Sequence, residues 1–449
     1  MLVPRLSSLV AAALLLAGCA DNPPGAGVAD QTVLTNFTLF DGSGSAPTPD
    51  SAMIVESGRI AWIGPAAELD APEGVEAVDL QDKFVMPGLI DLHVHLAVTE
   101  DFAMSKDVYT RENVERELGT YASYGVTAVQ VLGTDQDLIF GLRDEQRSGR
   151  PKMARVFTAG QGIVFAGGYG GVPGVNQPVA TVAEAKSAVA EQAAKGVDLI
   201  KLWVDDELGT MPAMPPEISK AVIDAAHNHG LRAIAHIFYL EDAKRLVKQG
   251  VDGLAHSVRD KPVDQELIDA MNARGTWQVA ETLSREAAMF AYGEPAPFLD
   301  DPFFTHSVSP SVIELLASPE RQRSVAGGPH FHDYPRFLET AKANLERLTD
   351  AGVKIAFGTD SGPPGRFPGY FAHWELELMV EACATPIEAL TAATGSAAEF
   401  LHADDLGTLE AENWADFIVL NASPVEDIRN TRTISAVYIA GQPIERDAR

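Results

Sequence analysis

Two histidines one residue apart give the strongest chemical signal in the sequence. They end the run PGLIDLHVH, which spans residues 87–95. In a β-strand, residues i and i+2 point to the same face, so His93 and His95 can bind one metal ion together. Imidazole suits Zn, Fe, Ni and Co better than Mg or Ca. Two neighbouring core imidazoles without a partner would be costly, which favours metal ligation over a purely structural role.

Two further histidines end short apolar segments. His236 closes the run AIAH, and His256 lies in the run LAHS. Each histidine alone is as compatible with a core position as with a metal ligand. Together with His93 and His95 they would place four imidazoles at one end of a sheet, and this combination favours ligation.

Lys201 lies inside the apolar run 199–204, LIKLWV. A lysine in such a strand must lose its charge, pair or react. A neutral lysine can add CO2, and the resulting carbamate is a carboxylate that can bridge two cations. The alternative is a lysine that extends to the strand end and pairs with Asp205 or Asp206.

Asp360 follows the apolar run that ends in Gly358-Thr359. A carboxylate beside a metal can bind the ion, and it can accept the proton of an attacking water. We therefore assign Asp360 as both a metal ligand and the catalytic residue. The alternative is an N-cap for the next helix.

The elements that must position these residues alternate between apolar strands and helical stretches after Pro87-Gly88, which predicts a parallel sheet. About eight such units is the count of a (β/α)8 TIM barrel, an α/β fold in which functional residues lie at the C-terminal ends of the strands. The predicted strands are Leu89–Leu96, Thr127–Leu132, Arg155–Ala159, Leu199–Val204, Arg232–Ile237, Gly253–Ser257, Trp277–Glu281 and Lys354–Thr359.

The two flanking regions have a different pattern. Residues 31–86 and 405–449 contain short strands separated by turn residues, and we predict that they form one composite β-sandwich domain. The barrel then spans 87–404. Within it, the stretch 283–339 is longer than a strand-to-helix loop needs, and insertions there are commonly lids or substrate walls.

The first thirty residues have the pattern of an export signal. Arg5 precedes an apolar run, residues 9–17, that is too short to span a bilayer but suits a signal peptide. The run LAGC ending at Cys19 resembles a bacterial lipobox, which implies a signal peptide over 1–18, lipidation of Cys19 and a tether over 19–30. Ala20 then favours the outer membrane over the inner one. The alternative is an ordinary secretory signal.

The formal net charge of −29 argues against binding to nucleic acid. The expected partner is a small-molecule substrate, with membrane contact only through the N-terminal lipid on the periplasmic side. The oligomeric state stays open, a homo-oligomer included. With Cys19 acylated, Cys383 has no partner for a disulfide within the chain.

This set of motifs resembles the amidohydrolase superfamily, and it is nearest to the prolidase-like and imidazolonepropionase-like branch. The resemblance covers nearly the whole chain after the tether. It implies two divalent metal ions, which we expect to be zinc, with carboxylated Lys201 as a bridging ligand. His93, His95, Lys201 and Asp360 would hold the more buried ion. Lys201, His236 and His256 would hold the other.

The expected function is hydrolysis of a C–N bond in a small substrate, such as a dipeptide or an N-acyl amino acid. We expect Tyr239 and Tyr169 to bind the substrate, the latter from the glycine-rich loop 167–171. Three alternatives stay open: a mononuclear deaminase or lactonase, a phosphotriesterase-like hydrolase, and a non-catalytic metal-binding lipoprotein.

Overall fold

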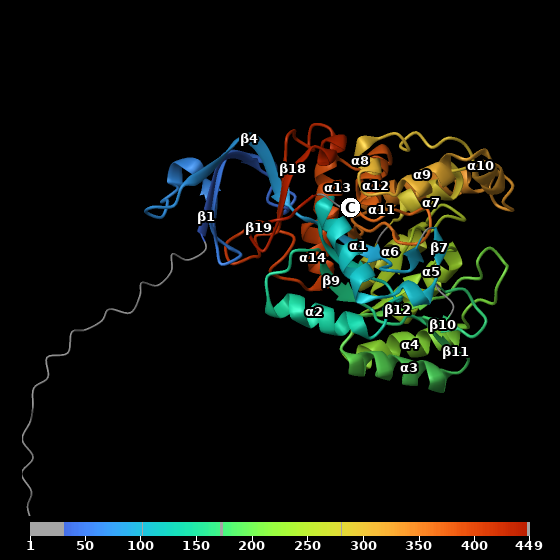
Figure 1. The fold of residues 1–449 in the computed structure, drawn as a ribbon. Coiled ribbons are helices and arrows are strands. Elements are labelled where there is room, and N and C mark those ends of the chain that lie inside the picture. Colours follow the sequence, from blue (N-terminus) through green and yellow to red (C-terminus); the bar gives the residue numbers. More distant parts are fainter. Residues whose placement is uncertain (1–30, 101, 171–173, 280, 447–449) are drawn as a thin grey trace, which may run out of the picture.

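The computed structural model describes residues 31–446 apart from 101, 171–173 and 280. The predicted signal peptide, Cys19 and the tether lie outside this part of the chain. A β-sheet region lies beside a larger body of strands and helices (Figure 1). Within the described ranges, no helix has the length and apolar character needed to cross a membrane.

Eight parallel strands form the core of the larger body, and they coincide with the eight predicted strands. Every residue of β5, β8, β12 and β13 is buried, as expected for parallel strands covered on both faces. The predicted parallel α/β architecture is confirmed. The strands are β5 (Leu89–Val94), β8 (Val126–Val131), β9 (Arg155–Thr158), β12 (Ile200–Trp203), β13 (Ala233–His236), β14 (Gly253–Ala255), β15 (Trp277–Val279) and β16 (Ile355–Ala356).

These strands belong to two sheets. One has the order β5-β8-β9, and the other has the order β11-β10-β12-β13-β14-β15-β16, with β10 (Ile163–Phe165) and β11 (Gln177–Val179) at its edge. Backbone hydrogen bonds link the two sheets, from Leu92 N to Phe357 O (3.0 Å) and from Asp360 N to His93 O (2.7 Å). The end of β5 therefore lies directly beside the segment that follows β16.

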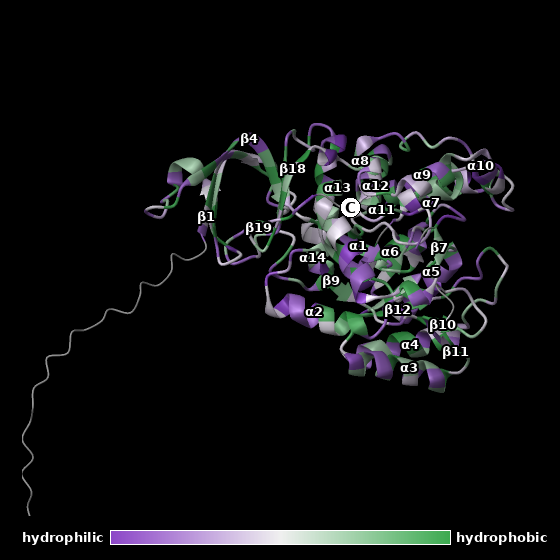
Figure 2. Cartoon of the chain, viewed as in Figure 1, coloured by the Kyte–Doolittle hydropathy of each residue, from purple (hydrophilic) through white to green (hydrophobic). Residues whose placement is uncertain are grey.

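Helices cover the strands, and their ends follow local sequence signals. Thr181 and Glu184 form a capping box at the start of α3, and Gly196 ends that helix with φ +79°. Hydrophilic residues colour much of α2 and α3 (Figure 2). The helices of the body are α1 (Arg111–Ser123), α2 (Leu138–Ser148), α3 (Val182–Lys195), α4 (Pro216–Asn228), α5 (Leu240–Gln249), α6 (Gln265–Arg274), α11 (Tyr334–Asp350), α12 (Tyr370–Glu381), α13 (Pro386–Ala392) and α14 (Gly395–Leu401).

The β-sheet region contains strands from both flanks of the body. Its seven strands have the order β19-β18-β17-β4-β1-β2-β3, so β4 and β17 join the two parts of the chain. They are β1 (Gln31–Leu39), β2 (Thr48–Glu56), β3 (Arg59–Pro65), β4 (Ala77–Pro87), β17 (Phe417–Leu420), β18 (Ile434–Ile439) and β19 (Gln442–Pro443). The two flanks therefore form one sheet, and the second layer of the predicted sandwich stays a prediction.

A buried ion pair connects this sheet to the body. Arg155 at the start of β9 donates two hydrogen bonds to Asp416, Nε to Oδ2 at 2.6 Å and Nη2 to Oδ1 at 3.1 Å. Asp416 Oδ1 also accepts from the backbone of Ala440 at 2.6 Å. Loss of either partner would leave an unpaired buried charge, so this contact fixes the sheet against the body.

The long stretch after β15 is a packed part of the fold. It forms α7 (Leu283–Ala291), α8 (Pro302–Thr305), α9 (Pro310–Ala317) and α10 (Pro319–Ala326). Phe298 and Phe304 from this stretch are buried in one apolar cluster with Tyr370 and Phe371 of α12. The insertion 283–339 is therefore anchored to the body.

Candidate metal centre

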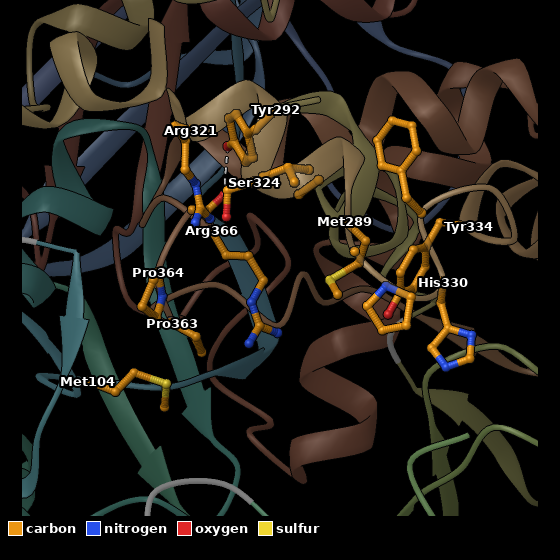
Figure 3. A pocket seen from close by; sticks show the side chains of 16 residues that line it. Met104, Met289, Tyr292, Arg321, Ser324, His330, Tyr334, Pro363, Pro364 and Arg366 are labelled. Carbon is orange, nitrogen blue, oxygen red and sulfur yellow. Dashed lines mark hydrogen bonds between the residues drawn. The ribbon is translucent and has the colours of Figure 1, made fainter. Parts of the chain in front are cut away.

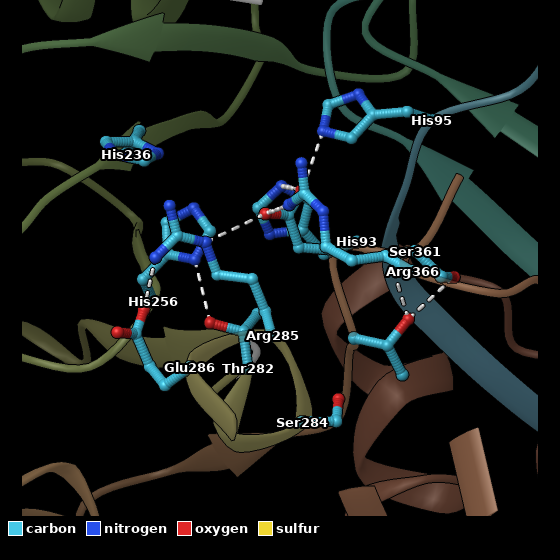
Figure 4. A network of polar contacts seen from close by, with 12 residues as sticks. His93, His95, His236, His256, Thr282, Ser284, Arg285, Glu286, Ser361 and Arg366 are labelled. Carbon is cyan, nitrogen blue, oxygen red and sulfur yellow. Dashed lines mark hydrogen bonds and ion pairs between the residues drawn. The ribbon is translucent and has the colours of Figure 1, made fainter. Parts of the chain in front are cut away.

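The parallel strands bring five of the six predicted metal ligands around one cavity of about 140 Å³, which we call the metal cavity. His93 lies in β5 and His95 directly after it, His236 ends β13, His256 follows β14, and Asp360 follows β16. The ring centroids of His93 and His256 are 4.7 Å apart, and those of His236 and His256 are 4.3 Å apart (Figure 4).

Lys201, the sixth predicted ligand, is completely buried in β12 and does not line this cavity. Its Nζ has no hydrogen-bond partner among the described residues, so the pairing with Asp205 or Asp206 that we considered is not formed. Burial lowers the pKa of Lys201 to about 7, although Asp360 and Asp205 act in the opposite direction. Burial therefore favours the neutral amine more than it is favoured in an exposed lysine.

Three of the ligands fit a divalent metal ion. Donor atoms of His93, His95 and Asp360 all lie within 4.8 Å of one another, and all three residues are buried. Asp360 Oδ1 is 2.8 Å from His95 Nε2 and 3.4 Å from His93 Nε2. Imidazole and carboxylate are a donor set typical of zinc and similar ions. Within the part of the chain that is described, His93 Nδ1 also lacks a hydrogen-bond partner despite its burial.

Two threonines orient histidine rings of the site. His95 Nδ1 lies 3.0 Å from Thr134 Oγ1, and His256 Nδ1 lies 2.8 Å from Thr282 Oγ1. A hydrogen bond at Nδ1 fixes the ring orientation and leaves Nε2 available as a ligand atom. The sequence did not single out these threonines.

The electrostatics of the site favour ligand forms of these side chains. Burial, followed by the charge of Lys201, holds the pKa of His93 well below its usual range. Burial likewise lowers the pKa of His236 to about 4. For Asp360, burial alone would raise the pKa. The charge of Arg366 and the hydrogen bond with His95 outweigh burial and hold the pKa well below its ordinary value. Neutral imidazole and ionised carboxylate are the metal-binding forms.

Asp91 connects the two strands that carry the His–His–Asp group. Its Oδ2 accepts from Thr359 Oγ1 at 2.6 Å, and its Oδ1 accepts from the backbone N–H groups of Thr359 and His93 at 3.0 and 3.1 Å. Burial raises the pKa of Asp91 to about 7, although these hydrogen bonds oppose the rise. Asp91 therefore positions the metal ligands and does not face the cavity.

The loop after β16 is shaped by close backbone contact. Asp360 has φ +59°, and Gly362 has φ +114°. A Cβ atom on Gly362 would lie 1.8 Å from the carbonyl oxygen of His95, so only glycine fits there. The loop therefore brings Asp360 against His93 and His95 at the cost of an unfavourable backbone conformation.

The sequence did not predict the roles of three charged residues of the site. Arg366 and Arg285 were not identified, and Asp205 was considered only as a partner of Lys201. Arg366 lines the metal cavity and donates to Asp360, and Arg285 Nε lies 3.4 Å from the same carboxylate. Asp205 Oδ2 lies 2.7 Å from His236 Nε2. Asp205 follows β12 directly, which is a signal that sequence analysis could have used. The positions of the two arginines depend on loop and insertion geometry.

The two predicted substrate-binding tyrosines lie in different places. Tyr169 lines the metal cavity, with its ring centroid 5.1 Å from that of His236. Tyr239 donates its hydroxyl to Asp206 at 2.7 Å, and it is not among the residues that line the metal cavity. Part of the loop that carries Tyr169, residues 171–173, lies outside the described residues.

A model of the Amidohydrolase family matches residues 84–444, which include every predicted metal ligand. The chain belongs to the amidohydrolase family. Members of this family generally bind divalent metals, in agreement with the His–His–Asp group. Together with its relatives, the family match identifies this amidohydrolase as a hydrolase that acts on C–N bonds.

Individual relatives agree with this assignment. The amidohydrolase is 26% identical to an imidazolonepropionase of Deinococcus radiodurans, over 87% of this chain and 91% of that protein. It is 27% identical to the enzyme of the same name from Deinococcus deserti, over 90% and 97% of the two chains. Among solved structures, a putative prolidase from Bifidobacterium longum is similar with a TM-score of 0.73, at 25% identity over 93% of this chain and 95% of that one.

We predict that Thr134→Val weakens metal binding by about 10- to 100-fold, because His95 loses the contact that fixes its ring. The apparent metal dissociation constant is measured by competition with a chromogenic chelator. Thr340→Val is the matched control, since Thr340 is half-buried on α11, away from the metal cavity, and its hydroxyl donates to the helix backbone at Arg336. An affinity in Thr134→Val equal to that of the control would show that Thr134 does not support the metal centre.

Proposed function

We propose that this amidohydrolase cleaves the amide bond of a small substrate, a dipeptide or an N-acyl amino acid, with two divalent metal ions. The imidazole and carboxylate ligands fit zinc. The observation that supports this proposal best is the convergence of four buried histidines and Asp360 on one cavity. Lys201, whose Nζ has no hydrogen-bond partner among the described residues, is close enough to influence the pKa of all four rings. The eight parallel strands fit the (β/α)8 barrel of such an enzyme, and the composite sheet fits a layer of the β-sandwich.

The ligands divide into two groups that share Lys201. His93, His95 and Asp360 would hold one ion, and His236 and His256 the other. Carboxylation of Lys201 would supply the bridge: the neutral Nζ attacks the carbon of CO2, an N–C bond forms and one proton leaves, which gives a carbamate with one negative charge. The lowered pKa of Lys201 supports this step, because only the neutral amine is a nucleophile.

The side chains around the cavity have separate tasks in hydrolysis. Divalent ions held there would supply Lewis acidity, polarising the scissile carbonyl and lowering the pKa of water. Asp360 accepts the proton of the attacking water and passes it to the leaving nitrogen. Its depressed pKa keeps the carboxylate ionised and ready to accept that proton. Tyr169 and Trp203 contribute to the wall that limits access of bulk water.

Metal-dependent hydrolysis is tested with zinc-loaded protein, chelator-treated protein and a panel of dipeptides and N-acyl amino acids. We expect the loaded protein to release free amino acid and the chelated protein to be inactive until zinc is restored. A phosphotriester and a lactone belong in the same panel. Activity on these two alone, or binding of zinc with no hydrolysis at all, would overturn the amide assignment.

Lys201→Ala is expected to reduce kcat by a factor of at least about 10³ and to lower bound metal from two ions to one per chain, because the bridging ligand is lost. Short carboxylic acids should restore part of the activity. In the wild type, ¹³C-labelled bicarbonate should produce a carbamate signal in the NMR spectrum that is absent from Lys201→Ala. Lys220→Ala, on the exposed face of α4, is the matched control. Full activity in Lys201→Ala would contradict the two-metal site.

We also propose that the mature protein begins at a lipidated Cys19 and is held on the periplasmic side of the envelope, at the outer membrane. The apolar run before Cys19 and the Pro/Gly-rich stretch after it support this location. Lipoprotein processing supplies more than one acyl chain, which stable anchoring needs.

Cys19→Ser is expected to move the protein from the membrane fraction to the soluble fraction of lysed cells, because the acyl-bearing thiol is gone. Cell fractionation followed by immunoblotting measures the distribution, and mass spectrometry of the wild-type N-terminus measures the acylation. Cys383→Ser is the matched control and should stay with the membrane. A Cys19→Ser variant that sediments like the wild type would refute the anchor.

A further inference from the structure

A second cavity, of about 410 Å³, lies next to the metal cavity. We call it the side cavity. It is lined by α7, α10 and residues 328–334 of the insertion, together with Met104 and with residues 363–366 of the loop after β16. The metal cavity, at about 140 Å³, is close to the roughly 150 Å³ that hold a single benzene. Of these two cavities, the side cavity is the one with the size of a typical ligand pocket, roughly 300–1,000 Å³.

The two cavities share a wall. Met104, Pro363 and Arg366 line both of them. In Figure 3 the Arg366 side chain runs down the middle of the view, with Pro363 and Met104 on one side and Met289 and Tyr334 on the other. A molecule at Arg366 can therefore extend into either cavity.

The insertion and the loop that carries Arg366 are connected. Tyr292, which directly follows α7, donates its hydroxyl to the backbone oxygen of Gly365 at 2.7 Å. Arg366 is one residue further on, and its own backbone oxygen accepts from Gly362 N at 2.8 Å. The insertion thus supports the position of Arg366 in addition to lining the side cavity.

The walls of the side cavity are apolar and cationic. Its apolar lining includes Met289, Tyr292, Val325, Phe331 and Tyr334. Among its described lining residues are two arginines, Arg321 and Arg366, and no carboxylate, although the chain has 63 acidic residues and a net charge of −29. This composition fits a ligand that is apolar and carries a negative charge.

The arginines around the metal cavity share their carboxylate partners. Arg259 and Arg285 both pair with Glu286, while Arg285 and Arg366 both face Asp360. Asp360 and Glu286 thus each serve two guanidinium groups, and Asp205 also interacts with Arg259. Among the hydrogen bonds between described residues, the Arg366 guanidinium donates only through Nη1. Its remaining N–H groups can bind a carboxylate, for which the planar guanidinium is well suited.

We propose that the side cavity is the specificity subsite for the amino acid that hydrolysis releases: Arg366 binds its α-carboxylate, and the side cavity takes a large apolar side chain. This proposal rests on the proposed amide hydrolysis. An α-amino acid carries its nitrogen, carboxylate and side chain on one carbon. With the nitrogen in the metal cavity and the carboxylate on the shared Arg366, the side chain points into the side cavity. The substrate class is then N-acyl or N-aminoacyl derivatives of large apolar amino acids.

Turnover of three related amides tests the subsite. We expect kcat/KM for N-acetyl-L-phenylalanine to exceed that for N-acetyl-L-alanine by about 10- to 100-fold, the gain from burying a large apolar side chain. N-acetylphenethylamine, which lacks the carboxylate, should be poorer than N-acetyl-L-phenylalanine by about 10- to 100-fold. In Arg366→Met this second preference should disappear, whereas the exposed Arg429→Met should keep it.

Equilibrium binding tests the subsite without catalysis. Isothermal titration of the zinc-loaded protein with L-phenylalanine, L-alanine and phenethylamine should give at least tenfold tighter binding of L-phenylalanine. Met289→Trp fills the side cavity and should remove the preference over L-alanine. Leu315→Trp, an exposed position of the same insertion, should preserve it. Circular dichroism checks that both variants fold. The comparison of the three probes on the wild-type protein does not depend on either variant.

The outcomes separate the two proposals. Selective binding of L-phenylalanine without hydrolysis of any amide would refute the proposed function, and it would leave Arg366 and the side cavity as a binding site for an apolar carboxylate. Amide hydrolysis with equal binding of all three probes would overturn the subsite and leave the proposed function intact. A preference that survives in Arg366→Met and Met289→Trp would also overturn the subsite.

Discussion

The buried carboxylate of Asp91 is the contact on which the rest of the metal centre depends. It joins the backbone of β5 at His93 to Thr359 in the segment after β16, through three hydrogen bonds of 2.6 to 3.1 Å. A buried carboxylate without such partners would be strongly unfavourable, so the two segments are stable only in this relative position. That position determines how Asp360 faces His93 and His95. The aspartate of the PGLIDLHVH run is therefore explained by positioning, and the two histidines by the metal binding that we propose.

The same site concentrates groups that folding alone would not bury together. Four histidines, Lys201 and Asp360 are all at most 7% exposed, and His256 and Asp360 have φ +70° and +59°. Each of these features opposes folding, and such features commonly gather where a protein binds or reacts. Burial keeps the imidazoles neutral, and the arginines keep Asp360 ionised. Burial of these polar groups opposes folding, but the same buried imidazoles and carboxylate are suited to bind cations.

Much of this arrangement could be predicted from the sequence, because it depends on local rules. Alternating apolar strands and helices predicted the parallel sheet, and the side-chain period of a strand predicted that His93 and His95 point the same way. The strand ends then predicted the positions of His236 and His256.

Other features of the site depend on distant parts of the chain. Arg366 reaches Asp360 only because Gly362 lets the loop turn against His95, and no spacing rule places Arg285 from the insertion beside that loop. Tyr239 shows where a local rule fails. Its position after the strand that ends in His236 predicted a place in the metal cavity, but its hydroxyl donates to Asp206 instead.

The candidate metal ligands and the side cavity are supplied by different parts of the chain, the parallel strands and the insertion. The metal ligands lie on or directly after strands of the parallel core, whose burial gives them little freedom to move. The side cavity is built from helices outside that core, and it contacts the core loop through Tyr292 and Gly365. Substitutions in the insertion can therefore change which molecule fits without disturbing the ligands. An insertion that supplied only a cover for the site would need no arginine in its wall. In a chain with an excess of 29 negative charges, a cavity wall with two arginines and no carboxylate among its described residues is better explained by recognition of an anion.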